Sequence, residues 1–128
     1  MDVCIIAASK SDEEIVGNIT KILEEYKISY ELQFASAHRE PEKVQSIVAH
    51  SHAKVFIAVA GLAAALPGFV ASITKKPVIG VPVSSKLGGL DALLSIVQMP
   101  RGVPVAAVGI DNGENAAHLA KRILDAAQ

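Results

Sequence analysis

A short polar stretch in the first third of the chain carries the residue types that acid–base chemistry and anion binding need. Residues 36–41 read Ser-Ala-His-Arg-Glu-Pro. Histidine has an unperturbed pKa of about 6.5 and can exchange protons near neutral pH. Arg39 carries a planar fork of donors that suits phosphate or carboxylate. Pro41 fits the first turn of a helix, and helix starts favour anions. Taken alone, the same residues also suit a surface loop.

The composition restricts the class of protein. Of the 128 residues, 51% are hydrophobic and 20% are charged, so we expect residues 1–128 to form a single globular domain. The net charge of −1 argues against nucleic-acid binding, which usually needs a concentrated basic face. A single cysteine, Cys4, excludes an internal disulfide framework and any multi-cysteine metal site. Because a strand is predicted almost directly after Met1, we expect a cytoplasmic protein without a signal peptide.

The hydrophobic pattern predicts alternating strands and helices. Wholly apolar runs of strand length indicate buried strands at 3–8, 55–59, 77–82 and 105–110. Residues 30–34 instead alternate apolar and polar side chains, which is typical of an edge strand with one solvated face. Five helices are predicted. The first begins at a Ser11–Glu14 capping box, and the third is short and ends near Ile73. The second, fourth and fifth cover 41–51, 91–98 and 114–127.

One segment has the length of a membrane span. Residues 55–74 contain no charged side chain and lie between Lys54 and Lys75. Gly61 and the Pro67-Gly68 pair divide the segment, which therefore predicts a buried strand, a loop and a short helix. We expect no membrane-spanning helix.

The alternation of five strands with five helices predicts an α/β fold in three αβα layers, with a five-stranded parallel sheet in the middle. With the strand at 30–34 on an edge, the natural strand order is the flavodoxin-like (Rossmann-like) order 2-1-3-4-5. Ligands of such folds bind beyond the carboxyl ends of the strands at the switch point, here between the first and third strands. The loops expected to meet there are residues 9–12, 36–39 and 60–66.

These three loops offer complementary chemistry. Three hydroxyls, one guanidinium and two helix starts could together hold a phosphate without a metal. The side chains concerned are Ser9, Ser11, Ser36 and Arg39. Asp12 suits ribose hydroxyls, although both Ser11 and Asp12 also suit helix capping. Residues 60–66 are only glycine, alanine and leucine, which suits either a dry wall for a flat ring or tight strand-to-helix packing.

His38 has no predicted partner for nucleophilic catalysis and no second histidine nearby for a metal site. We expect the other histidines, His50, His52 and His118, to be surface residues. A solitary histidine beside a bound ring is best suited to general acid–base catalysis.

Five stretches, in order and over nearly the whole chain, resemble the PurE family of purine biosynthesis: residues 9–12, 36–39, 60–68, 78–83 and 90–100. The resemblance implies a carboxyl transfer on aminoimidazole ribonucleotide that involves carbon dioxide but no metal, ATP or organic cofactor. In the bacterial form, N(5)-carboxyaminoimidazole ribonucleotide is rearranged by a mutase. The carboxylate moves from the exocyclic nitrogen to a ring carbon, and carbon dioxide is released and recaptured inside the site.

The resemblance also implies roles for single residues. His38 aligns with the histidine that shuttles the ring proton, and Asp12 aligns with the ribose contact. The family's phosphate contacts align with Ser9, Ser36 and Arg39. The remaining implied substrate-binding positions are Ser11, Ala37, Gly61, Ala65 and Leu66. Family members are homo-octamers with sites at subunit interfaces, so the resemblance implies the same assembly here.

Three positions depart from the usual family pattern, which has glycine at Ala8 and Leu62 and histidine at Ala65. Ala65 removes a polar group from the wall that faces the transferred carboxylate. The animal-type branch, which carboxylates aminoimidazole ribonucleotide directly with carbon dioxide, also lacks this histidine, whereas Arg39 and residues 98–100 resemble the bacterial branch. We therefore expect a mutase, with the direct carboxylase as the alternative. An alternative of another class is a non-catalytic module that binds a phosphorylated metabolite.

Overall fold

Five parallel strands form one sheet in the order β2-β1-β3-β4-β5. The computed structural model, which describes residues 1–128, thus confirms the predicted flavodoxin-like order and the position of β2 at an edge. The strands are β1 (Val3–Ala7), β2 (Tyr30–Phe34), β3 (Val55–Gly61), β4 (Val78–Val83) and β5 (Ala106–Ala107).

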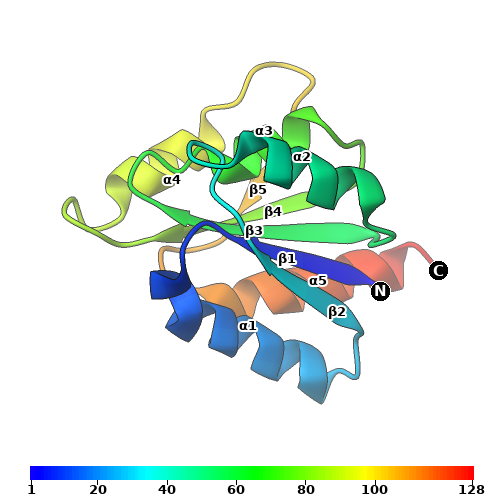
Figure 1. The fold of residues 1–128 in the computed structure, drawn as a ribbon. Helices are drawn as coiled ribbons and strands as arrows, with labels where there is room; N and C mark the ends of the chain where they lie inside the picture. Colours follow the sequence, from blue (N-terminus) through cyan, green and yellow to red (C-terminus); the bar gives the residue numbers. More distant parts are fainter.

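Helices cover both faces of the sheet, as Figure 1 shows. On one face lie α1 (Glu13–Glu25) and α5 (Gly113–Ala126), which pack against each other. On the other face lie α2 (Pro41–His50), α3 (Leu66–Ser72) and α4 (Leu90–Val97). The predicted three-layer architecture is confirmed, and the bounds of α2, α4 and α5 agree with the sequence expectation to within one residue.

The apolar strands divide their side chains between two hydrophobic cores because successive side chains of a strand point to opposite faces. In β1, Cys4 and Ile6 belong to the core under α2, α3 and α4, whereas Val3, Ile5 and Ala7 belong to the core with α1 and α5. Burial of each larger aliphatic side chain stabilises the fold by about 1.5–3 kcal/mol. The same burial raises the pKa of the Cys4 thiol to about 12, with Glu31 adding to the effect.

Residues 55–74 form β3, a loop and α3, as the glycine and proline positions predicted. No helix in the structure combines the length and the apolar character that crossing a membrane requires.

The fifth strand is shorter than predicted, with two residues in place of 105–110. Ala107 pairs with Gly80, so Pro82 is the next β4 residue whose backbone faces β5. Proline has no N–H to donate, and the ladder ends there. Beyond Ala107, the N–H of Val108 donates to the carbonyl of Gly80 at 3.2 Å, and the N–H of Asp111 donates to the carbonyl of Pro82 at 2.8 Å.

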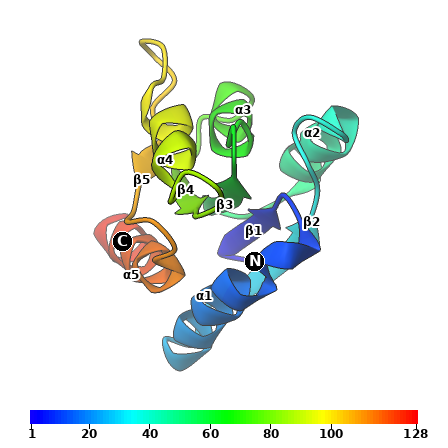
Figure 2. The same ribbon diagram turned by 90° about the vertical axis from the view of Figure 1, so that its left-hand side faces the viewer.

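The loops that follow the strands gather at one end of the sheet, on the left of Figure 1 and toward the viewer in Figure 2. This end includes the switch point between β1 and β3, where the chain leaves the two neighbouring strands toward opposite faces. The fold therefore brings the three predicted loops to one edge of the sheet.

Candidate functional site

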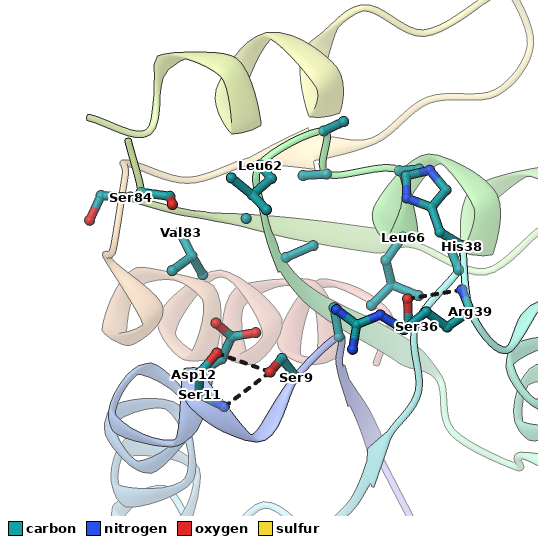
Figure 3. Close-up of a pocket in the computed structure, with 18 residues that line it drawn as sticks. Ser9, Ser11, Asp12, Ser36, His38, Arg39, Leu62, Leu66, Val83 and Ser84 are labelled. Atoms are coloured by element: carbon teal, nitrogen blue, oxygen red, sulfur yellow. Dashed lines mark hydrogen bonds between the residues drawn. The ribbon is translucent and has the colours of Figure 1, made fainter. Parts of the chain in front are cut away.

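A cavity of about 590 Å³ lies beyond the carboxyl ends of β1, β2, β3 and β4, and Figure 3 shows the side chains around it. Its volume is in the range typical of small-molecule sites. All ten predicted site residues line it: Ser9, Ser11, Asp12, Ser36, Ala37, His38, Arg39, Gly61, Ala65 and Leu66. The structure brings these residues together, while their individual roles stay predictions.

The first loop is built around Ser9. A short 3-10 helix, Lys10–Asp12, follows β1, and the Ser9 hydroxyl caps it by accepting the N–H of Ser11 at 3.2 Å. The Ser11 hydroxyl also donates to Ser9 at 2.9 Å. Since Ser9 accepts twice, its own proton remains free to donate into the cavity.

The predicted capping box is wrong. The 3-10 turn delays the start of α1 to Glu13, so Asp12 rather than Ser11 occupies the position before the helix. The Asp12 side chain makes no capping hydrogen bond either. Both side chains therefore lie at the cavity without a capping role.

Asp12 is the one buried charged residue of the chain, with 7% of its surface exposed. Burial raises the pKa of the Asp12 carboxyl, and a backbone hydrogen bond from Ser9 partly opposes this shift. A carboxylate desolvated in a cleft, rather than used in a cap or ion pair, is typical of a functional site.

The second loop presents two side chains that have no partner within the chain. The Ser36 hydroxyl holds the turn by accepting the N–H of Arg39 at 3.2 Å. The Arg39 guanidinium takes part in none of the ion pairs or side-chain hydrogen bonds of the chain, and neither does the His38 ring. His38 and Arg39 line the same cavity as Ser9 and Asp12, as catalysis by His38 requires.

The other histidines lie outside this cavity. His50 and His52 are exposed, as predicted, and Nδ1 of His50 lies 2.8 Å from the carbonyl of Ser46. His118 is half-buried, and its Nδ1 lies 2.7 Å from the hydroxyl of Tyr26.

The third loop forms the apolar wall. Gly61 ends β3 in close contact with β4, where an added Cβ would lie 3.2 Å from the carbonyl oxygen of Val83. Leu62 then adopts a left-handed conformation with φ 56°, and Ala65 leads into α3 with right-handed geometry. Leu66, only 1% exposed, anchors the wall in the core beneath α3. The wall offers apolar surface and little polar chemistry.

Sequence reasoning missed a fourth part of the cavity, formed by Val83, Ser84 and Ser85 after β4. Asp111 holds this segment: its carboxylate accepts the Ser84 N–H at 2.8 Å and the Ser84 hydroxyl at 2.5 Å. The position of Ser84-Ser85 at the carboxyl end of a central strand was a usable signal. No sequence signal indicated the hydrogen bonds between Ser84 and Asp111, which lies 27 residues away.

A second cavity, of about 720 Å³, lies beside the start of β4 and is lined by Lys75 and Lys76 but by no histidine or carboxylate. No group of three or more His, Cys, Asp or Glu side chains in the chain is placed to hold a metal ion. Of these two cavities, only the first brings a histidine, an arginine and a carboxylate together.

Comparison with known proteins extends these observations. The family model described as AIR carboxylase matches residues 2–128. The N5-carboxyaminoimidazole ribonucleotide mutase of Methanocaldococcus jannaschii is 62% identical over 122 residues, which cover 95% of this chain and 78% of that protein. The phosphoribosylaminoimidazole carboxylase of Schizosaccharomyces pombe is 52% identical over 124 residues, 94% of this chain but 22% of that protein. The crystal structure of Treponema denticola PurE superposes with a TM-score of 0.88 at 34% identity, covering 98% of this chain and 81% of that one.

Proposed function

This chain belongs to the AIR carboxylase family, and we propose that it is an enzyme of purine biosynthesis, an N(5)-carboxyaminoimidazole ribonucleotide mutase. The observation that carries the proposal is the convergence of an unpartnered histidine, an unpartnered arginine and a buried carboxylate on one cavity. The 62% identity to a protein named as this mutase supports the choice of reaction.

The substrate phosphate is assigned to Ser9, Ser36 and Arg39, with Ser11 beside them. A guanidinium without an ion-pair partner is a strong site for a dianion, and the serine hydroxyls can donate to its oxygens.

The rest of the substrate extends from Asp12 to the apolar wall. Asp12 accepts hydrogen bonds from the ribose hydroxyls, which return to it part of the solvation lost by burial. The imidazole ring rests against the surface formed by Ala37, Gly61, Ala65 and Leu66. Residues 1–128 thus act as a single ribonucleotide-binding catalytic domain.

His38 is the general acid–base. The bond between the exocyclic nitrogen and the carboxyl carbon breaks, its electron pair stays on nitrogen, and carbon dioxide remains in the cavity. The ring carbon then forms a bond to carbon dioxide and loses its proton. His38 takes that proton and supplies one to the nitrogen, a role worth about 10²–10⁴ in rate. The net reaction is an isomerisation and needs no external acid, base or cofactor.

A direct carboxylase is the second candidate. The S. pombe relative carries the name phosphoribosylaminoimidazole carboxylase and is 52% identical over the matched residues. Ala65 contributes only a methyl group to the wall of the cavity, in place of the histidine of the usual pattern. In this reaction carbon dioxide would enter from solution, and His38 would only remove the ring proton.

We also infer a cytoplasmic homo-octamer. Four exposed apolar side chains follow one another at helical spacing on and just before α4, with exposed fractions of 69%, 56%, 47% and 47%: Leu87, Leu90, Leu94 and Val97. Such a stripe is typical of a surface that another subunit covers. Light scattering of the purified protein should give eight times the chain mass, and a monomer would overturn this assembly.

The proposed activity is tested by supplying N(5)-carboxyaminoimidazole ribonucleotide to the purified protein and following formation of 4-carboxyaminoimidazole ribonucleotide. We expect conversion far above the spontaneous rate. Absence of product both from this substrate and from aminoimidazole ribonucleotide supplied with carbon dioxide, with aminoimidazole ribonucleotide still bound, would replace the enzyme with a phosphometabolite-binding module.

A further inference from the structure

Leu62 has a backbone conformation that suits its position but not its residue type. The chain leaves β3 at Gly61, pressed against Val83, and must reverse within a few residues to enter α3. A left-handed residue makes this turn, with φ 56° at Leu62. Left-handed geometry is unfavourable for a side chain larger than glycine, apart from asparagine and aspartate. The turn therefore needs a left-handed residue but does not need a leucine.

The Leu62 side chain makes little packing contact with the rest of the fold. It is 56% exposed and lies in neither hydrophobic core, nor among the partly buried apolar residues packed on them. Of the exposed large apolar residues, it alone lines the cavity. Figure 3 shows it between Ser84 and His38, across the cavity from Asp12 and Ser9.

We propose that Leu62 is a specificity-determining residue whose side chain covers the bound imidazole ring and closes the apolar side of the cavity around carbon dioxide. The inference rests on the proposed function. A residue with a strained backbone and few packing contacts in the fold is typical of a site where a bound ligand provides the missing contacts.

The chemistry of the proposed reaction explains what an apolar side chain adds there. Carbon dioxide is small and uncharged, and none of the polar groups of the cavity can hold it by charge. A hydrophobic cover keeps water out of the cavity and slows the escape of carbon dioxide while the ring turns its reacting carbon toward the carbon dioxide. The flat face of the ring gives an isobutyl group a surface to cover, whereas glycine at the same turn would leave that face wet.

The chain offers a matched control in Lys27, which is also left-handed, with φ 59°, but lies in the turn after α1 and away from the cavity. Leu62→Gly and Lys27→Gly both relieve left-handed strain, so each should raise the melting temperature, by about 2–5 °C. A fall in melting temperature for Leu62→Gly would show that Leu62 packs into the fold or a subunit contact, and would overturn the proposal.

Binding separates the two variants. By calorimetry, Leu62→Gly should bind aminoimidazole ribonucleotide about 5–20-fold more weakly than wild type, because the ring loses its apolar cover. Lys27→Gly should bind as wild type does, and Leu62→Met, which keeps an apolar side chain of similar reach, should stay within about twofold. Equal affinity of Leu62→Gly and Lys27→Gly would overturn the role of Leu62.

Retention of the carboxyl carbon gives the second readout. Substrate labelled with ¹³C in its carboxylate is converted in unlabelled bicarbonate, and the label in the product is measured by mass spectrometry. Wild type, Lys27→Gly and Leu62→Met should keep most of the label, whereas Leu62→Gly should lose several times more of it. Equal retention in Leu62→Gly would contradict the closure. If wild type does not convert this substrate, the mutase assignment fails, and the affinity ratio still decides the role of Leu62.

Discussion

Apart from residues 83–85 after β4, the cavity has two halves that are made in different ways. One half, after β1 and β2, is polar, and its properties come from side-chain types: hydroxyls, a free guanidinium and the buried carboxylate of Asp12. The other half, residues 61–66, is apolar, and its properties come from backbone shape: a glycine pressed against β4 and a left-handed leucine. The polar half suits recognition and proton transfer, whereas the apolar half suits exclusion of water. Substitutions in the two halves should therefore fail in different ways.

The largest effect is expected in the polar half, at His38. His38→Asn should lower the turnover number by about 10²–10⁴, because the proton shuttle is lost, and should leave ribonucleotide affinity nearly unchanged. Steady-state kinetics together with calorimetric binding measures both quantities. A large loss of affinity in this variant would mean that His38 binds the substrate instead of moving its proton.

Arg39→Ala should give a different pattern, since the guanidinium is assigned to binding. We expect affinity to weaken by about 1.5–3 kcal/mol, the range for a hydrogen bond to a charged group. Calorimetry at two salt concentrations checks the charge contribution, because the loss should be smaller at high salt. Unchanged affinity would place the phosphate elsewhere in the cavity.

Gly61→Ala tests the apolar half through shape alone. The new methyl group would lie 3.2 Å from the backbone oxygen of Val83, which would have to give by a few tenths of an ångström. We expect a loss of about 1–3 kcal/mol in the free energy of unfolding, together with weaker binding, measured by urea denaturation and calorimetry. Full stability with full affinity would show that the close approach at Gly61 has no importance for the wall.

The smallest effect concerns pH and Asp12. Because burial raises the pKa of the Asp12 carboxyl in the folded state, folding favours its proton. The contribution of this carboxyl to stability is therefore most favourable below its unfolded pKa of about 3.9 and declines as pH rises through the folded value. Asp12→Asn, a neutral near-isostere, should be more stable than wild type at pH 7, with the difference shrinking toward pH 4.

Urea denaturation at both pH values measures this difference, and calorimetry should show weaker ribonucleotide binding by the same variant. A variant less stable than wild type at pH 7 would mean that the carboxylate stabilises the fold. The pattern expected here, more stable but less able to bind, would assign Asp12 to the ligand.

Most of the fold, and the residues that line the polar half of the cavity, were predictable from sequence. The alternation in 30–34 placed β2 at the edge, and the strand order followed from that placement. His38, Arg39 and the serines were recognisable because few residue types can do their chemistry. The early end of β5, opposite Pro82 of β4, was not predictable, because it depends on which β4 residues face β5 in the finished sheet.

The remaining features depend on contacts between distant residues or on backbone angles. The Ser84–Asp111 hydrogen bonds join segments that only the sheet brings together. The start of α1 at Glu13 depends on a 3-10 turn that the Ser11–Glu14 spacing could not distinguish from a capping box. The left-handed geometry of Leu62 contradicts the preference of its residue type, and residue preferences therefore could not predict it.

The central claim is that the cavity moves a carboxyl group already attached to the substrate. The most direct test offers the protein both carboxyl sources separately: N(5)-carboxyaminoimidazole ribonucleotide alone, and aminoimidazole ribonucleotide with carbon dioxide equilibrated with bicarbonate. The rate of 4-carboxyaminoimidazole ribonucleotide formation is compared at matched ribonucleotide concentrations. We predict much faster product from the carboxylated substrate, which would make Ala65 a tolerated departure from the family pattern. Efficient product from free carbon dioxide at modest concentration would contradict the mutase and make the protein a direct carboxylase.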